Sequence, residues 1–199
     1  MLCHSTITST APVIRHVANN WPMTTATRTK LNLGCGHDVR EGWVNVDKFP
    51  ASDSVVQADF PYLPFEDNTS EEVVLSHVLE HFGYAEGEIL VREIHRVLGP
   101  GGVATIEVPD INWCLAQFLG APEPNGYTNP QNDYNTSHKW GLWAQAIWGD
   151  QHHDGLFHKW GYTPHRLLNL LHHCGFNQVN IDFVPSHGVQ CLLARATKA

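Results

Sequence analysis

Two glycines and an aspartate near the start of the chain have the types and the spacing that a nucleoside cofactor requires. Gly34 and Gly36 end a short apolar run that begins at Leu31, and Asp47 ends the next apolar run. A glycine turn lets a ligand approach the backbone where a Cβ would block it. A carboxylate after the following strand can accept hydrogen bonds from a ribose diol. The sequence therefore predicts a nucleoside site at the ends of its first two strands.

The spacing of this motif argues against a dinucleotide. Only residues 35–42 separate the two predicted strands, whereas a parallel crossover normally needs a dozen or more residues and usually a helix. The third glycine of a dinucleotide fingerprint is missing, because Val39 stands at its position. Asp47 also follows Gly34 by only 13 positions, and a dinucleotide fingerprint has its acid about 20 residues on. We expect a nucleoside cofactor other than NAD.

Strand patterns alternate with helix patterns along the chain. Apolar runs predict strands at 30–33, 43–46, 55–58, 73–75, 103–108, 178–184 and 189–196. An apolar face repeats with helical spacing over residues 85–98 and ends at GPGG, and a later helix begins at Thr163-Pro164 and ends at Gly175. Such alternation predicts a mostly parallel Rossmann-like α/β sheet with helices on both faces and a final antiparallel hairpin.

A long segment rich in tryptophan and histidine, residues 111–162, follows the fifth strand. Ligands bind at the carboxyl ends of parallel strands, so we interpret it as a helical and loop cover over a substrate site. A small helical subdomain whose tryptophans form a core is the other reading, and the two are compatible. Residues 1–27 are Ser/Thr-rich and contain no acid, which predicts a mobile tail before a domain at 28–199.

Composition excludes several classes of protein. A net charge of −8 argues against a binder of nucleic acid in bulk. No apolar run approaches the roughly 20 residues that span a bilayer, so we expect no membrane partner. Five cysteines without paired spacing favour a reducing compartment, and we expect a cytoplasmic protein. A homodimer stays open.

With these features together, the chain resembles the class I S-adenosylmethionine-dependent methyltransferases, and within them the small type-11 group. Six blocks carry the resemblance over residues 30–110, in the order LNLGCG (31–36), GWVNVD (42–47), ADF with LPF (58–60, 63–65), SHVLEH (76–81), REIHRVL with PGG (92–98, 100–102) and VPD (108–110). It returns at FHK (157–159) and CGF (174–176). The shortened first crossover is also typical of this group.

The resemblance implies a seven-stranded sheet in the order 3-2-1-4-5-7-6, with the last strand antiparallel, and S-adenosylmethionine as the cofactor. Its methionine part would lie over Gly34, Cys35 and Gly36, next to Leu33. Asp47 would hold the ribose. The implied neighbours of the adenine and of the sulfonium are Asp59 with Phe60 and Ser76 with His77. Arg92 and Glu93 are expected on a solvated helix face.

Methyl transfer from a sulfonium is an in-line displacement, so the enzyme chiefly aligns the nucleophile and excludes water. An oxygen or nitrogen nucleophile often also needs a base, and histidine suits this role. The candidate catalysts are His158, His81, Asp110 and His138, with His158 first because it lies in the FHK block before the late helix. We expect a small-molecule acceptor, aromatic or sugar-like, methylated at oxygen.

Three other readings stay open. His77-x-x-Glu80-His81 matches the H-x-x-E-H motif of zinc peptidases, although it follows a β-rich run and stands in order among the methyltransferase blocks. His152, His153, Asp154 and His158 could bind zinc or iron, but we predict no metal. A non-catalytic partner protein that only binds the cofactor is the third.

Overall fold

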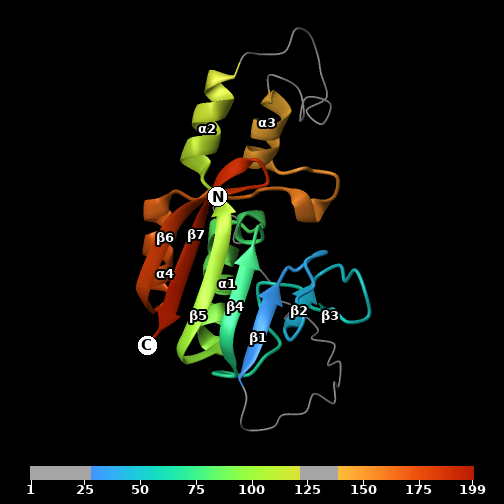
Figure 1. Ribbon diagram of the computed structural model, residues 1–199, viewed down its shortest axis with the longest axis vertical. Helices are drawn as coiled ribbons and strands as arrows, with labels where there is room; N and C mark the ends of the chain where they lie inside the picture. The colour runs from blue at the N-terminus through green and yellow to red at the C-terminus, as the bar shows by residue number, and fades with distance from the viewer. Residues whose placement is uncertain (1–27, 122–138) are drawn as a thin grey trace, which may run out of the picture.

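The computed structural model describes residues 28–121 and 139–199, which form a seven-stranded sheet (Figure 1). The strands are β1 Thr29–Leu33, β2 Val44–Asp47, β3 Val56–Gln57, β4 Ser70–Ser76, β5 Leu98–Pro109, β6 Phe176–Ser186 and β7 Val189–Lys198. Their order is β3-β2-β1-β4-β5-β7-β6, and β7 runs antiparallel to both of its neighbours. The predicted order and the antiparallel last strand are confirmed. The predicted tail at 1–27 and His138 lie outside the described residues.

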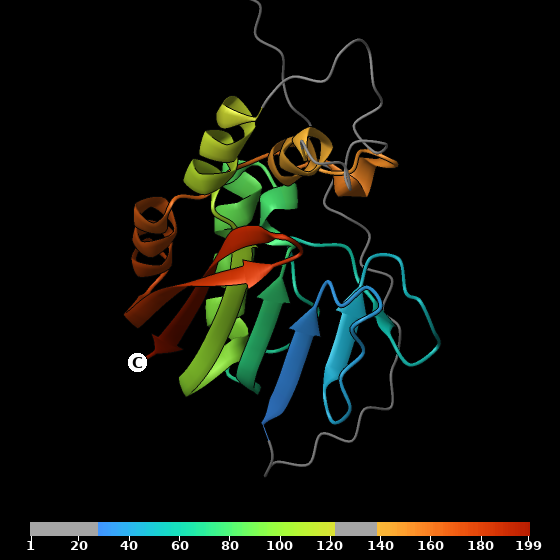
Figure 2. The ribbon, with the colours of Figure 1, turned by 45° about the horizontal axis from the view of Figure 1, so that its top comes forward.

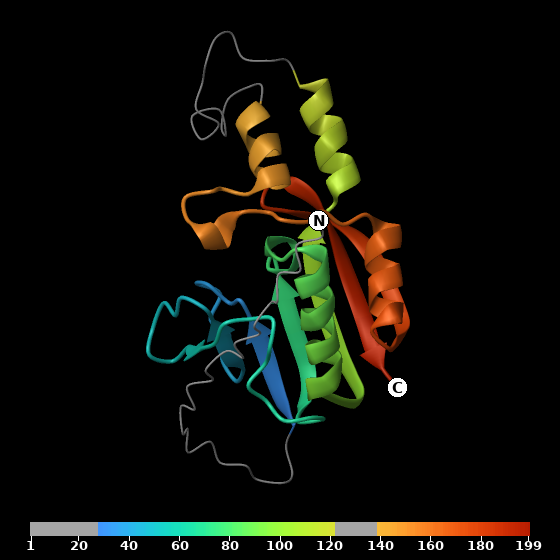
Figure 3. The ribbon, with the colours of Figure 1, turned by 180° about the vertical axis from the view of Figure 1, so that it is seen from behind.

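One face of the sheet is covered by α1 (Tyr84–Val97) and α4 (Pro164–His173), which lie together behind the strands in Figure 1 and in front of them in Figure 3. Alternate strand residues supply the apolar layer below them, including Leu33, Leu75 and Ile106. The predicted start of α4 holds, because the hydroxyl of Thr163 accepts from Arg166 N at 3.2 Å. None of the described helices is long and apolar enough to cross a membrane.

Two further helices, α2 (Ile111–Gly120) and α3 (Trp140–Trp148), project beyond the carboxyl ends of the strands (Figures 1 and 2). They form a second core, in which the rings of Trp113 and Trp143 meet edge to face at 5.2 Å. Val189 and Cys191 join this core. Because these two alternate with Leu192 along β7, they belong to the sheet face opposite α1 and α4. The segment after β5 thus has a core of its own.

Two asparagine side chains bond the backbone of the short connection between β1 and β2, which contains no helix. Asn32 Nδ2 donates to Asp38 O at 2.6 Å and to Asn45 Oδ1 at 3.0 Å. Asn45 also accepts from Arg40 N and donates to Arg40 O, both at 2.9 Å. Both asparagines are buried, so this pair satisfies backbone groups that a crossover helix would otherwise bond internally.

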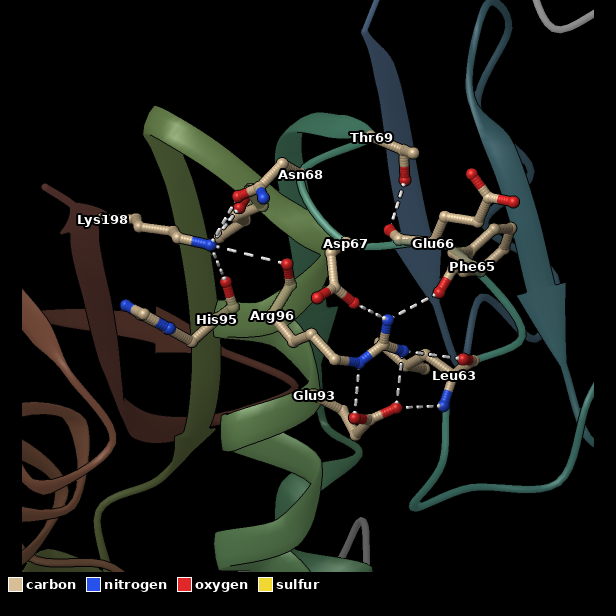
Figure 4. A network of polar contacts seen from close by, with 11 residues as sticks. Leu63, Phe65, Glu66, Asp67, Asn68, Thr69, Glu93, His95, Arg96 and Lys198 are labelled. Atoms are coloured by element: carbon tan, nitrogen blue, oxygen red, sulfur yellow. Dashed lines mark hydrogen bonds and ion pairs between the residues drawn. The ribbon is translucent and has the colours of Figure 1, made fainter.

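A network around Arg96 fixes the segment before β4 to α1 (Figure 4). The guanidinium donates to Leu63 O at 3.0 Å, to Phe65 O at 2.8 Å and to both carboxylate oxygens of Glu93. Glu93 in turn accepts from Leu63 N at 2.9 Å. Glu93 was expected on a solvated face, and this was wrong, because its side chain is only 17% exposed. Arg92, by contrast, makes an exposed pair with Glu88.

Lys198, in β7, caps the end of α1. Its ammonium donates to His95 O at 2.8 Å and to Leu98 O at 2.6 Å, as Figure 4 shows in part. A cation at this position complements the unpaired carbonyls of a helix C-terminus. These bonds attach β7 to the C-terminal end of α1.

Candidate functional site

The glycine turn after β1 lies at the carboxyl edge of the parallel strands (Figure 2). Gly34 and Gly36 have φ angles of 65° and 50°, a region that favours glycine. A Cβ on Gly34 would collide with the side chain of Val78, which follows β4. The turn is therefore tight against the β4 loop, with buried Leu33 anchoring it in the core. Burial raises the pKa of the neighbouring Cys35 thiol, which keeps it protonated at neutral pH.

Asp47 is tied to this turn through its carboxylate. Oδ2 accepts from Gly36 N at 2.8 Å and Oδ1 accepts from Phe49 N at 2.8 Å. Each carboxylate oxygen can accept a second hydrogen bond, so the ribose diol expected here could be bound without breaking either contact. The backbone donors fix the orientation of the carboxylate in advance.

The adenine candidates lie at the end of β3. Ala58 N donates to Asp47 O at 3.1 Å, which holds this strand end beside β2. Phe60 packs on the main core. The side chain of Asp59 is 70% exposed and pairs with Lys48 Nζ at 3.0 Å. A carboxylate placed in this way can turn toward a ligand, but it is not held in position as Asp47 is.

His77 is a half-buried cation between two carboxylates. Its Nδ1 lies 3.2 Å from Glu80 Oε1 and its Nε2 lies 3.3 Å from Glu107 Oε1. Burial opposes the charge, but the interactions with Cys191, Glu107 and Glu80 outweigh it and raise the pKa of His77 to about 12. The hydrogen bond with His77 lowers the pKa of Glu107 to about 2. Ser76 Oγ also bonds Glu107, at 3.3 Å, so the Ser76–His77 pair joins β4 to β5.

His81 and His158, the two leading candidates, lie together although 77 positions separate them. Their ring centroids are 4.9 Å apart, and one ligand atom from each and one from Glu80 all lie within 4.8 Å of one another. His81 Nδ1 bonds Phe157 O at 3.1 Å and His158 Nδ1 bonds Ala146 O at 3.1 Å. A carbonyl can only accept, so each Nδ1 carries the proton and each Nε2 keeps its lone pair when the ring is neutral.

Burial disfavours the protonated form of His158. Desolvation lowers its pKa below the usual 6.5, more than the charge of Glu80 raises it. The backbone of Glu80 fixes the segment that carries His158, because Glu80 O accepts from Lys159 N at 2.8 Å and from Trp160 N at 3.2 Å. His158 is thus a neutral imidazole near pH 7, held beside a buried carboxylate.

The other candidate catalyst within the described residues has a different role. Asp110 caps α2, where it accepts from Asn112 N at 3.1 Å, and its second oxygen accepts from Gln190 Nε2 at 3.0 Å. Both carboxylate oxygens accept hydrogen bonds that join β5 to α2 and β7. We therefore assign Asp110 a structural role. His138 lies outside the described residues.

The two metal readings of the sequence are not supported in their original form. His77 has a φ of 53° and faces Glu107, whereas His81 faces Phe157 and His158. The H-x-x-E-H segment therefore does not place both of its histidines on one helix face. Within residues 28–121 and 139–199, two sets of three metal-ligating side chains come within 4.8 Å, and neither includes His152, His153 or Asp154.

Two carboxylates that the structure places at the candidate site were not singled out as site residues from the sequence. Glu80 was noticed only as part of a peptidase motif, and Glu107 was not singled out. A lone acid inside the apolar run 103–108 was the available signal for Glu107, because a charge in a central strand needs a partner. For Glu80 the signal was its place among the two histidines of SHVLEH.

A family model described as a methyltransferase domain matches residues 31–106. This range contains the glycine turn, Asp47 and the Glu80–His81 pair. No curated protein matches the sequence.

Solved structures share the fold at low identity. A SAM-dependent methyltransferase from Archaeoglobus fulgidus is 18% identical, with a TM-score of 0.56 and 87% of each chain covered. A SAM-dependent methyltransferase from Thermotoga maritima, described as a possible histamine N-methyltransferase, is 13% identical, with a TM-score of 0.55 over 86% of this chain and 82% of the other. The 1,6-didemethyltoxoflavin-N1-methyltransferase of Burkholderia thailandensis, with 1,6-didemethyltoxoflavin and S-adenosylhomocysteine bound, is 19% identical, with a TM-score of 0.53 over 86% and 72%.

Proposed function

We propose that this chain is a class I S-adenosylmethionine-dependent methyltransferase, which its matched domain and its fold support, and that it methylates a small-molecule acceptor at an oxygen atom, with His158 as the base. The observation that carries the proposal is the neutral, half-buried imidazole of His158 at the carboxyl edge of the sheet. Its Nδ1 bonds Ala146 O at 3.1 Å, which leaves the Nε2 lone pair for a proton.

The cofactor half of the site follows from the turn and Asp47. Gly34, Cys35 and Gly36 would pass below the methionine part, where a Cβ at Gly34 would already meet Val78. Asp47 would accept from the ribose, and Asp59 with Phe60 would flank the adenine. The sulfonium activates the methyl group, so the remaining tasks are alignment of the nucleophile and exclusion of water. Ser76 and His77 would lie beside it, held by Glu107.

The acceptor half rests on His158 and Glu80. An acceptor hydroxyl must lose its proton as the methyl–oxygen bond forms, and a neutral imidazole in hydrogen-bond reach can take it. The resulting imidazolium would be stabilised by Glu80, whose charge favours protonation of His158. Val78 links this half to the cofactor half, because it contacts Gly34 and stands two residues before Glu80.

A small acceptor is supported by three observations. The Burkholderia structure that shares this fold has 1,6-didemethyltoxoflavin and S-adenosylhomocysteine bound. The aromatic rings of Trp148 and Trp160 are exposed on the segment after β5 and could stack on a flat acceptor. The charge of −8 disfavours a polyanionic acceptor.

Four buried cysteines without disulfides, Cys35, Cys114, Cys174 and Cys191, support a cytoplasmic setting.

Transfer of labelled methyl groups to a cell extract tests this function. Labelled product is expected in the small-molecule fraction and not in the protein or nucleic acid fractions. His158→Ala should lose turnover yet keep its affinity for S-adenosylmethionine, with His165→Ala, an exposed residue of α4, as the matched control. Label in the protein fraction would reject the acceptor class, and full activity of His158→Ala would reject the base. Cofactor binding without any S-adenosylhomocysteine formation would instead favour a non-catalytic partner protein.

A further inference from the structure

Three buried side-chain polar atoms in the described part of the chain lack a hydrogen bond. They are both carboxylate oxygens of Glu80 and the hydroxyl of Tyr162. Glu80 is only 2% exposed, and its carboxylate forms an ion pair through Oε1 with His77 Nδ1 at 3.2 Å. A buried carboxylate whose oxygens accept no hydrogen bond is costly, so this group has room for a further partner.

The groups that surround Glu80 define what this partner is. His81 and His158 each present an Nε2 lone pair, because their Nδ1 atoms bond the carbonyls of Phe157 and Ala146. Metal-binding histidines typically donate the other ring N–H to a carbonyl in this manner, which fixes the tautomer and the ring orientation. Two imidazole nitrogens and one carboxylate oxygen are the ligand set of open zinc and non-haem iron sites.

We propose that Glu80, His81 and His158 bind a divalent transition-metal cation, for which Zn²⁺ is the representative, at the carboxyl edge of the sheet. The three ligand atoms lie within 4.8 Å of one another. In a tetrahedral site with metal–ligand bonds of about 2.0–2.2 Å, ligand atoms lie roughly 3.3–3.6 Å apart, so the widest pair would close by up to about 1.4 Å when the metal binds. Hard cations such as Mg²⁺ prefer all-oxygen ligands and fit this set poorly.

The local charge also favours a cation. Two carboxylates, Glu80 and Glu107, face the single ring of His77 at 3.2 and 3.3 Å. The backbone holds the ligands together before any metal arrives, since Glu80 O accepts from Lys159 N and Trp160 N. The second cluster, His77 with Glu107 and Cys191, is a poorer candidate because both ring nitrogens of His77 already face carboxylates.

The consequence for activity rests on the proposed function. The Nε2 atom of His158 cannot be a metal ligand and a proton acceptor at once, so the cation and the acceptor proton compete for one lone pair. Zn²⁺ is therefore expected to inhibit methyl transfer, and a chelator is expected to restore it. This makes the same three side chains a site of regulation by metal.

Calorimetric titration of the chelator-treated full-length protein with Zn²⁺ alone tests the site without cofactor or acceptor. We expect one saturable site that Mg²⁺ does not occupy. Glu80→Gln and His158→Ala should each weaken it at least tenfold, since even the outer partners of metal ligands are worth about 10–100-fold. His165→Ala, which removes an exposed histidine of α4, should leave it unchanged. Affinity for S-adenosylmethionine checks that each variant is folded.

A spectroscopic measurement keeps the test decisive. Co²⁺ in place of Zn²⁺ should give the visible absorption of a low-coordinate nitrogen and oxygen site, and His81→Ala should abolish it. Absence of one-to-one binding, or equal weakening by His165→Ala and His158→Ala, would overturn the metal site. Neither result would contradict the proposed function, because methyl transfer with His158 as base needs no metal. Conversely, failure to observe methyl transfer would not affect the interpretation of the Zn²⁺ titration.

Discussion

The backbone N–H of Gly36 donates to Asp47 Oδ2 over 2.8 Å, so the glycine turn and the carboxylate expected to bind ribose form one unit. Asp47 thereby shapes the turn and keeps lone pairs that, under the proposed function, would accept from the ribose of the cofactor. Its second oxygen accepts from Phe49 N, also at 2.8 Å. Removal of this side chain should disturb the turn and the ribose contact together.

Asp47→Ala is expected to weaken S-adenosylmethionine binding by at least tenfold. Hydrogen bonds to a charged group contribute about 1.5–3 kcal/mol each, and about 1.4 kcal/mol already corresponds to tenfold. Asp59→Ala is the comparison, and its loss should be smaller because that carboxylate is largely exposed. Calorimetry on both variants checks this. If both variants lost the same affinity for S-adenosylmethionine, the backbone hydrogen bonds that orient Asp47 would not contribute to cofactor binding.

Gly34→Ala should destabilise the protein more than Gly36→Ala does. Both residues have positive φ, which costs an L-residue roughly 1–2 kcal/mol. Only at Gly34 does the added Cβ meet Val78 as well, whereas the space at Gly36 is open. Denaturant unfolding of the two variants measures the difference. Val78→Ala should rescue Gly34→Ala in a double-mutant cycle and should not rescue Gly36→Ala; independence of the two sites would contradict the contact.

The ion pairs of His77 should make stability depend on pH. The folded protein raises the pKa of this histidine far above 6.5, so its contribution is complete below pH 6.5 and declines as the pH rises above it. The free energy of unfolding of wild type minus that of His77→Gln, measured by urea titration, should therefore shrink between about pH 6 and pH 9. Glu107→Gln removes one partner and should flatten the trend. A difference that grows with pH would show that His77 is neutral in the folded state.

Arg96→Lys should destabilise the fold by about 2 kcal/mol or more, because several hydrogen bonds to Leu63, Phe65 and Glu93 require the guanidinium geometry. Arg92→Lys is the matched control on the same helix. Its exposed pair with Glu88 should contribute at most about 0.5 kcal/mol. Thermal or chemical unfolding compares the two, and equal losses would argue that the network in Figure 4 is not what fixes the segment before β4.

The pH dependence of methyl transfer should identify the base. Burial lowers the pKa of His158, and only the neutral ring can accept a proton, so kcat/KM should fall only as the pH drops below 6.5. With the acceptor found in the extract screen, His158→Ala should lose both the activity and this acidic limb. If the residual activity of His158→Ala still fell at acidic pH, the group that titrates would not be His158.

Local sequence determined much of the framework. The run before Gly34 and the acid at Asp47 were sufficient to predict the cofactor edge, because strand ends and glycine turns are set by neighbouring residues. The Thr163-Pro164 pair likewise predicted the start of α4, since a helix cap acts over three residues. The order of the strands required the resemblance, because alternation alone predicts a parallel sheet but does not order it.

The acceptor side was decided only by the tertiary structure. The SHVLEH segment suggested one metal face, but the left-handed backbone at His77 turns that ring toward Glu107 and leaves His81 to the FHK segment. His158 comes to Glu80 and His81 because Glu80 O holds Lys159 N and Trp160 N from a segment far along the chain. Sequence spacing fixes neighbours within a helix or strand, whereas contacts across a sheet edge depend on loops that meet only after the core has packed.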